Sequence, residues 1–178
     1  MSFDFFLDEK NVLELGARRK IYETVSKYAG CHFREIERKS ELSAGTVKYH
    51  LHFLTKHSLI TLEKEGNNLR YFPKEFKPQN KLLMGLLRQE SIRRIILFIL
   101  INEGCAQESI IASVKLSPST VSWHIRKLED AKIIRSEKKG RTKSYLLLSD
   151  KNELMNLLIT HKESFLDKIV DNVIEMWG

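Results

Sequence analysis

The chain has few of the residues on which disulfide scaffolds, loop-built active sites and membrane spans depend. Its 178 residues include two cysteines, three prolines and eight glycines. The longest apolar run, Ile95 to Ile101, is far shorter than the ~20 residues of a membrane helix. No basic stretch opens the chain, so no signal peptide is expected. Cys31 and Cys105 lie in separate halves of the chain, so we expect no disulfide, and a cytoplasmic protein without membrane contact.

Motifs that carry enzyme chemistry are also absent. The sequence has no Gly-x-x-x-x-Gly-Lys phosphate loop, no Gly-x-Ser-x-Gly nucleophile turn and no His-Glu-x-x-His zinc motif. His50 and His124 hold equivalent places in two predicted helices. His124 has no second ligand three or four residues further on, and His52 would face away from His50. We therefore expect neither an enzyme nor a protein that needs a metal or another cofactor.

The charges favour one sign. Lysine and arginine number 30 against 23 acidic residues, giving a net charge of +7 and a pI of about 9.4. With 42% hydrophobic and 30% charged residues, the composition is typical of a soluble globular protein. The basic excess favours an acidic partner, and nucleic acid is the first candidate.

A stretch of the sequence occurs twice, 74 positions apart and without a gap. The first copy reads LSAGTVKYHLHFL from Leu42 to Leu54, and the second reads LSPSTVSWHIRKL from Leu116 to Leu128. At the same offset the identities extend from Arg19 to Tyr71 in the first copy, about 16 in all over roughly 55 residues. Such a match indicates a duplicated domain rather than a short-period repeat.

Each copy shows the same order of predicted elements. In the first copy, apolar spacing predicts helices over residues 11–28, 34–39 and 43–57, then strands over 59–64 and 69–72. In the second copy, it predicts helices over 81–102, 108–114 and 118–131, then strands over 133–138 and 143–148. Ser43 and Ser117 are expected N-caps of the third helices, and Pro118 suits a first helical position. Three helices followed by a β-hairpin are the order of a winged helix-turn-helix domain.

The predicted fold is therefore mainly α with small β-hairpin wings. Two tandem winged helix-turn-helix domains are expected at residues 1–73 and 81–149, joined by a proline-containing linker at 74–80. Residues 150–178 form a C-terminal element without a counterpart in the first copy, with a predicted helix over 151–177. One face of that helix carries Leu154, Leu158, Phe165, Ile169, Val173 and Met176. This face predicts a homodimer formed through the C-terminal helix, or a helix that folds back on the first domain.

The third helix and the wing of the second copy are the candidate DNA-binding surface. If Val121, Ile125 and Leu128 are buried, the outward face of residues 119–127 offers short polar and basic side chains, as a helix in the major groove does. The wing at 138–143 is basic, and lysines and arginines exceed acidic residues by nine to three between Lys115 and Lys143. The expected DNA contacts are Ser117, Ser119, Ser122, Trp123, Arg126, Lys127, Lys138, Lys139, Arg141 and Lys143. The competing interpretation is a solvated basic face.

The corresponding surface of the first copy is nearly neutral. Between Glu41 and Arg70 it has four basic and three acidic residues. Because phosphate contacts supply much of the affinity for DNA, this copy should bind DNA more weakly, or contact protein instead. Its candidate contacts are Thr46, Lys48, Tyr49, His52 and Arg70.

Three segments of the first copy resemble archaeal winged helix-turn-helix regulators. They are the Arg-Arg-x-Ile-Tyr opening at Arg18 to Tyr22, the Gly-x-His-Phe-Arg-Glu-Ile segment at Gly30 to Ile36, and the Gly-Thr-x-x-Tyr-His-Leu helix at Gly45 to Leu51. The second copy, SPSTVSWHIRKLEDAKII, is similar to the recognition helix of ArsR/MarR-like proteins. Chains with two such domains resemble archaeal transcriptional regulators, among them activators of archaellum genes.

This resemblance implies a sequence-specific regulator that binds double-stranded promoter DNA. The basal transcription machinery is a further expected partner. By analogy, Thr120 joins Ser119, Ser122, Trp123 and Arg126 among the base and phosphate contacts. The cysteine pair that binds metal in ArsR-like proteins is missing, so sensing of a metal is not implied. The alternative is a winged-helix interaction module within a transcription or replication complex, and a steep fall of binding with salt would distinguish DNA binding from it.

Overall fold

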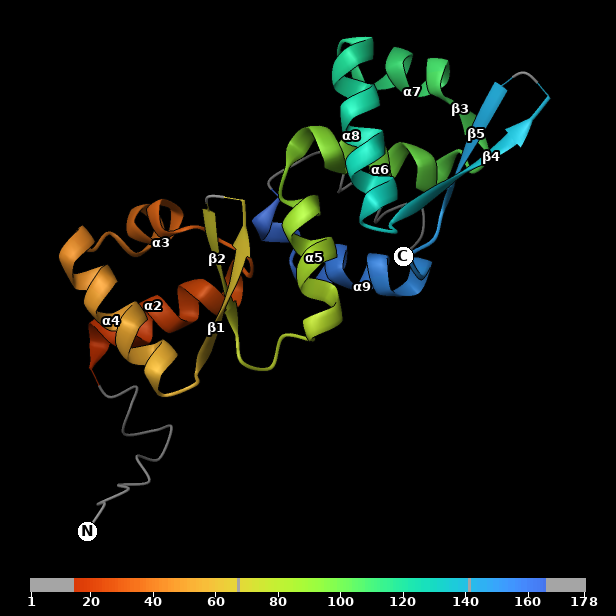
Figure 1. The fold of residues 1–178 in the computed structure, drawn as a ribbon. Coiled ribbons are helices and arrows are strands. Elements are labelled where there is room, and N and C mark those ends of the chain that lie inside the picture. Colours follow the sequence, from red (N-terminus) through yellow and green to blue (C-terminus); the bar gives the residue numbers. More distant parts are fainter. Residues whose placement is uncertain (1–14, 67, 141, 166–178) are drawn as a thin grey trace. The chain divides into compact units, whose positions relative to one another are not determined.

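The computed structural model describes residues 15–66, 68–140 and 142–165, apart from the side chain of Lys139. Internal contacts divide the chain into two compact units, Met1–Lys81 and Leu82–Gly178. Each unit combines α-helices with a β-hairpin (Figure 1). The predicted fold class, mainly helical with hairpin wings, is confirmed.

The first unit packs three helices against one hairpin. The helices are α2 (Gly16–Lys27), α3 (Phe33–Ser40) and α4 (Ala44–Lys56), and the strands are β1 (Ile60–Glu65) and β2 (Asn68–Pro73). The strands pair antiparallel from Ile60↔Pro73 to Glu65↔Asn68. One apolar side of each helix forms the core, which contains Ile21, Val25, Ile36, Val47, Leu51 and Leu54.

The second unit repeats this order and adds a third strand and a C-terminal helix. Its first helices are α5 (Pro78–Leu87), which contains the boundary between the units, and α6 (Glu90–Ile101). There follow β3 (Cys105–Ala106), α7 (Gln107–Val114), α8 (Pro118–Asp130), β4 (Ile134–Lys139), β5 (Thr142–Leu147), α9 (Lys151–Thr160) and the 3₁₀ turn η1 (Lys162–Ser164). The sheet order is β3-β5-β4. In the first unit a single bridge, Cys31↔Tyr71, takes the place of the β3–β5 pairing.

The helices α4 and α8 begin as the sequence predicts. The Ser43 hydroxyl accepts a hydrogen bond from the Thr46 amide at 3.3 Å, and the Ser117 hydroxyl accepts one from the Thr120 amide at 3.2 Å. Pro118 occupies the first turn of α8, where its missing N–H leaves no bond unmade. The two N-cap predictions are confirmed.

The single helix predicted over 81–102 is wrong, because the structure has two helices there. The helix α5 ends at Leu87 and α6 begins at Glu90, after Gln89 in an extended conformation. The buried Arg93 guanidinium donates to the Leu87 carbonyl at 2.6 Å. In an unbroken helix, a backbone N–H from the next turn would donate to that carbonyl instead. The first of these helices starts at Pro78, inside the segment predicted as a linker.

The C-terminal helix is also shorter than predicted. The helix α9 ends at Thr160 and is followed by η1. Leu154 and Leu158 are 0% exposed and Phe165 is 7% exposed, so the described half of the predicted apolar face is already buried within the chain. The other members of that face, Ile169, Val173 and Met176, lie outside the described residues. The described part of the face that suggested a dimer is therefore not available for contact with a second chain.

Over the ranges that the structure describes, no helix is both long and apolar enough to cross a membrane. The two cysteines are free thiols. Within the same ranges no group of histidine, cysteine and acidic side chains is arranged to hold a metal ion.

Candidate nucleic-acid interface

The outward face of α8 carries the polar and basic side chains expected from the sequence. Burial of Val121, Ile125 and Leu128, each at most 3% exposed, fixes the inner side of the helix. Because of the helical periodicity, the residues between these positions point away from the core. Ser119, Ser122, Trp123 and Arg126 are all exposed, and Trp123 keeps 59% of its surface.

The wing of the second unit carries opposed lysines near its tip. Lys138 and Lys143 are both exposed and lie directly opposite each other across β4 and β5. Like charges at such positions destabilise a hairpin by themselves, and an anion between or beside them would relieve that repulsion. Lys139 pairs through its backbone with Thr142 next to the tip, while Arg141 lies outside the described residues.

A chain of hydrogen bonds joins this wing to α8. The Tyr145 hydroxyl on β5 donates to Gln107 Oε1 at 3.1 Å, and Gln107 Nε2 donates to the Ser122 hydroxyl at 2.8 Å. Ser122 in turn donates to the Pro118 carbonyl at 2.8 Å. The hydroxyl of Ser122 thus has one acceptor position left. Sequence reasoning missed Gln107, because nothing local marks a glutamine on one helix as the bridge between a strand and another helix.

The hydroxyls at the start of α8 form a small cluster. The Ser117 oxygen lies 3.0 Å from the Ser119 oxygen and 2.7 Å from the Thr120 hydroxyl oxygen. The predicted contacts Ser117, Ser119 and Thr120 therefore lie together at the first turn. Hydroxyls at a helix N-terminus are groups that commonly contact DNA phosphates.

Lys127 differs from the other predicted contacts because it is half-buried. Its ammonium donates to Gln89 Oε1 at 3.3 Å and lies 5.8 Å from the centre of the Trp123 ring. These contacts hold the side chain against the unit's own surface. Lys127 is thus suited to orienting Trp123 and adding positive charge rather than to reaching a base edge.

The paired histidines are packed side chains. His124 is 6% exposed and its ring meets that of Trp123 edge-on, with 5.0 Å between centroids. Burial, and then the positive charge of Lys127, lower the pKa of His124. Burial, and then Arg18, lower the pKa of His50 in the first unit. Both imidazoles are therefore mainly neutral at neutral pH, and neither belongs to a group of ligands suitable for a metal among the described residues.

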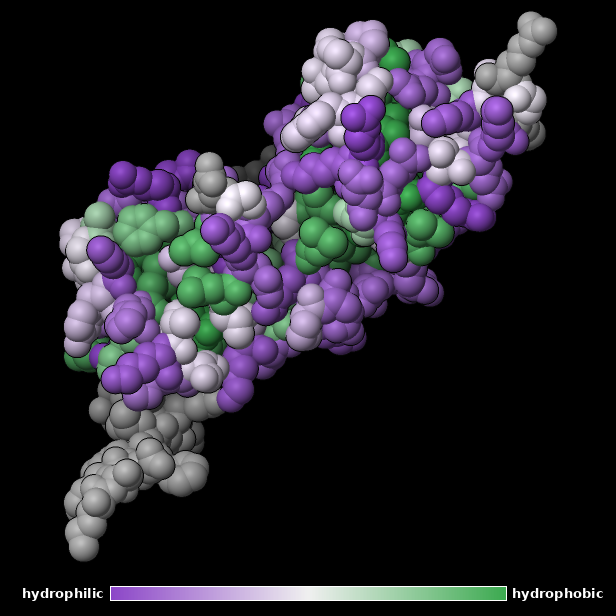
Figure 2. All heavy atoms as spheres, in the orientation of Figure 1, coloured by the Kyte–Doolittle hydropathy of each residue, from purple (hydrophilic) through white to green (hydrophobic). Residues whose placement is uncertain are grey.

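The first unit presents a less charged version of this surface. Lys48, Tyr49 and His52 are exposed on α4, while Thr46 is half-buried with its hydroxyl 2.9 Å from that of Ser43. Tyr49 retains 62% of its surface. The visible face of this unit shows apolar patches among the polar side chains, whereas the visible β4–β5 hairpin is mainly hydrophilic (Figure 2).

Arg70 does not belong to this surface, and its prediction as a DNA contact is corrected. The residue is 5% exposed, forms an ion pair with Glu65 and donates to the Gly30 carbonyl at 2.8 Å. Its guanidinium ties the wing to the loop before α3. In place of exposed lysines directly opposed across the strands, this wing exposes Leu62 (40%) and Leu69 (45%).

Comparison with known proteins agrees with the duplicated architecture. Residues 16–84 match a family described as an N-terminal HTH domain, and residues 88–135 match winged helix-turn-helix DNA-binding domains. The chain is 30% identical over 141 residues to an uncharacterized HTH-type transcriptional regulator of Methanocaldococcus jannaschii. That alignment covers 79% of this chain and 36% of the relative, so the chain spans about a third of the relative's length.

A protein of known structure from Corynebacterium diphtheriae is similar at 12% identity and a TM-score of 0.28, over 74% of this chain and 26% of that one. A likeness at that score carries no weight for fold or function.

Proposed function

We propose that this chain, a tandem helix-turn-helix protein similar to an archaeal transcriptional regulator, binds double-stranded promoter DNA in a sequence-dependent way through its second domain. The observation that carries the proposal is the exposed polar and basic face of α8 in the same unit as a wing with two directly opposed lysines. Such a surface is costly without an anion and suits a duplex.

In this proposal α8 enters the major groove and the wing contacts the backbone. Arg126 and Trp123 project from the exposed face and would meet base edges, since an arginine can bond guanine and an aromatic ring can contact a thymine methyl. Ser122 would accept a bond from a base amino group through its remaining lone pair. The hydroxyls of the first turn and the wing lysines would contact phosphates, which position the protein without reading sequence.

The experiment is selection from a pool of random duplexes at near-physiological salt, followed by titration of the enriched site with variants. Arg126→Ala should relax the preference at one position, at a cost of about 1–3 kcal/mol on the preferred site. Lys138→Ala and Lys143→Ala should lower the affinity for all duplexes by the same factor. Each should also reduce the slope of log K against log salt by about 0.9. Lys162→Ala removes an exposed charge from η1, which is part of neither α8 nor the wing, and serves as the matched control.

Two results would contradict the proposal. Binding without any enriched motif would leave only non-specific association with DNA. A salt slope that changes as much with Lys162→Ala as with Lys138→Ala would mean that net charge, and not the wing, determines the affinity.

The first domain supports a second candidate function, which is contact with another protein of the transcription machinery. The exposed Tyr49, Leu62 and Leu69 favour this role, because exposed apolar side chains are more typical of protein interfaces than of phosphate contacts. Tyr49→Ala in the full chain should then leave the affinity for the selected duplex within about twofold. A larger loss would place the first domain on DNA instead.

A homodimer remains part of the proposal, and it rests on the apolar residues predicted beyond Phe165. If the protein is dimeric, the selected motif should be palindromic, with half-sites separated by about one helical turn or a multiple of it. Sedimentation of the full chain, compared with a chain that ends at Phe165, tests this. A monomer that selects a single asymmetric motif would rule the dimer out.

A further inference from the structure

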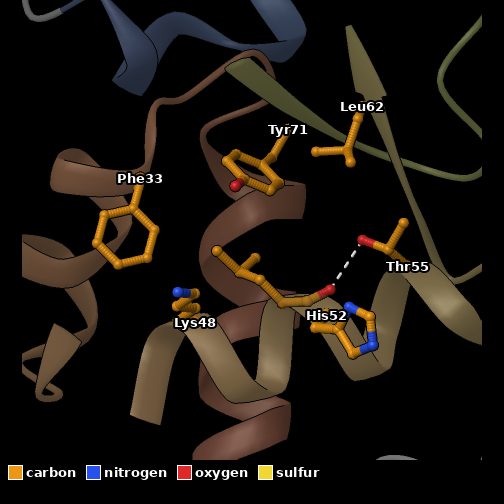
Figure 3. A pocket seen from close by; sticks show the side chains of 7 residues that line it. Phe33, Lys48, His52, Thr55, Leu62 and Tyr71 are labelled. Atoms are coloured by element: carbon orange, nitrogen blue, oxygen red, sulfur yellow. Dashed lines mark hydrogen bonds between the residues drawn. The ribbon is translucent and has the colours of Figure 1, made fainter. Parts of the chain in front are cut away.

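A cavity of about 220 Å³ lies in the first unit beside α4 and the β1–β2 hairpin (Figure 3). Its lining is mainly apolar, with polar side chains at several points. The residues that line it are Phe33, Lys48, Leu51, His52, Thr55, Leu62 and Tyr71. The Thr55 hydroxyl is not available to a ligand as a donor, because it donates to the Leu51 carbonyl at 2.8 Å.

In the second unit, hydrogen-bonded side chains occupy the positions that correspond to the lining of this cavity. At the offset of the repeat, Phe33 corresponds to Gln107, Lys48 to Ser122 and Tyr71 to Tyr145. In the second unit those side chains form the chain of hydrogen bonds from β5 to α8 described above. In the first unit, phenylalanine has no amide with which to make the bridge, so the corresponding space is left open.

Within the described ranges, the hydroxyl of Tyr71 lacks the partner that the hydroxyl of Tyr145 has. This residue is 8% exposed, and its hydroxyl points toward the space between Phe33 and Lys48 (Figure 3). Among the residues that the structure describes, no partner accepts a hydrogen bond from it, although the Tyr145 hydroxyl has one at 3.1 Å. The Tyr71 oxygen itself is not fully buried, so it can donate to water or to a ligand in the cavity. Burial raises the pKa of Tyr71, so the group remains a donor at neutral pH.

The cavity also has positive charge at its edge. Lys48 is exposed, lines the cavity and forms no ion pair within the described ranges. His52 lies one helical turn further along α4. The cavity thus combines apolar walls from Phe33 and Leu62 with a phenol donor and an ammonium group. That combination matches a small molecule that has an apolar ring and one anionic group.

We propose that the first domain binds a small carboxylate with an apolar body in this cavity, with the anion between the Tyr71 hydroxyl and the Lys48 ammonium. A cavity of about 150 Å³ accepts benzene, so the volume here leaves room for one six-membered ring and its carboxylate. The ligand would connect α4 to the wing as Gln107 connects α8 to its wing in the second domain.

The test is titration of the full chain with benzoate, followed by calorimetry and by NMR shifts. Benzamide has the same ring without the charge, and acetate has the charge without the ring. Benzoate should bind about tenfold more tightly than either, with shifts centred on Phe33 and Tyr71. Equal binding of benzoate and acetate would overturn the proposal, because the protein would then be attracting anions through its net charge alone.

The repeat supplies matched variants. Tyr71→Phe removes only the hydroxyl and should weaken benzoate binding about tenfold, whereas Tyr145→Phe removes the equivalent hydroxyl from the second domain and should leave benzoate binding unchanged. Lys48→Met should reduce the affinity for benzoate to that for benzamide. Equal effects of the two tyrosine variants, or unchanged benzoate binding in Tyr71→Phe, would refute the assignment.

A closing variant provides an independent check. Phe33→Gln combined with Lys48→Ser gives the first domain the side chains that bridge the second. The expected result is loss of benzoate binding in a chain that keeps its circular dichroism and melting temperature. If that chain does not fold, the comparison of Tyr71→Phe with Tyr145→Phe decides the question. Retained binding in a folded closing variant would place benzoate elsewhere.

Discussion

Replacing Tyr145 with phenylalanine tests whether the hydrogen bonds through Gln107 hold the wing against α8. The variant keeps the ring, which is 2% exposed, and deletes the donor that meets Gln107 Oε1 at 3.1 Å. A neutral hydrogen bond contributes about 0.5–1.5 kcal/mol net. Because Gln107 is half-buried, its oxygen can recover part of this from water, so we expect a loss of about 1 kcal/mol.

The fluorescence of the tryptophans reports the relevant unit. Both tryptophans, Trp123 and Trp177, belong to the unit Leu82–Gly178. Urea unfolding followed by this signal should show a lower midpoint for Tyr145→Phe with an unchanged slope. In a thermal scan the same loss corresponds to a shift of about 4–8 °C for a unit of this size.

A double-mutant cycle separates a connected chain of bonds from two independent ones. Ser122→Ala removes the other end, where Gln107 Nε2 donates at 2.8 Å. If Gln107 is fixed only when both bonds form, the two losses should fail to add by about 0.5 kcal/mol or more. Both variants should also lower the affinity of the protein for the selected duplex, since the wing would no longer be held at a fixed angle to the recognition helix.

Strict additivity, or a change below about 0.3 kcal/mol for Tyr145→Phe, would refute this reasoning. Tyr71→Phe is the matched control in the first unit, where the hydroxyl has no acceptor among the described residues. Its effect without ligand should stay within about 0.5 kcal/mol by calorimetry.

Three further changes have expected outcomes. Arg93→Met leaves the Leu87 carbonyl without its donor at 2.6 Å, and the urea midpoint should fall by the equivalent of about 2–4 kcal/mol; a loss below 1 kcal/mol would show that water replaces the guanidinium. Ser117→Ala removes the N-cap of α8 and should cost about 1 kcal/mol by the same measurement; an unchanged midpoint would show that the neighbouring hydroxyls replace the cap. The pKa values of His50 and His124 are lowered in the folded state, so the unfolded chain binds more protons below the ordinary histidine pKa. Stability should be fully present above about pH 6.5 and decline toward pH 5, and a curve that stays flat in the wild type would contradict the burial of neutral imidazoles.

The repeat made most of the fold predictable from the sequence. Two copies of the same apolar spacing without a gap left little freedom in the number and order of elements. Ser43 and Ser117 could be identified as N-caps because capping depends on residues three positions apart. The outward face of α8 could be predicted for the same reason, since helical periodicity alone determines which side chains oppose Val121 and Leu128.

The helix ends could not be predicted in this way. The break at Arg88–Gln89 depends on the guanidinium of Arg93, which reaches back to Leu87 only in the folded chain. The end of α9 at Thr160 interrupts an apolar spacing that continues in the sequence. Apolar spacing indicates which residues prefer burial, but it does not show where tertiary contacts replace the helix's own hydrogen bonds.

The sequence by itself determined the duplicated architecture, the caps and the exposed polar face of α8, because these depend on spacing within single elements. Only the tertiary structure decided the role of individual polar side chains. Arg70 is identical in type to a phosphate-binding arginine, yet it is buried against Glu65 and Gly30. The tyrosine that the two copies share forms a bridge in one copy and faces an open cavity in the other. The physical reason is that a hydrogen bond requires a partner across space, and that partner comes from a distant element whose position the local sequence does not contain.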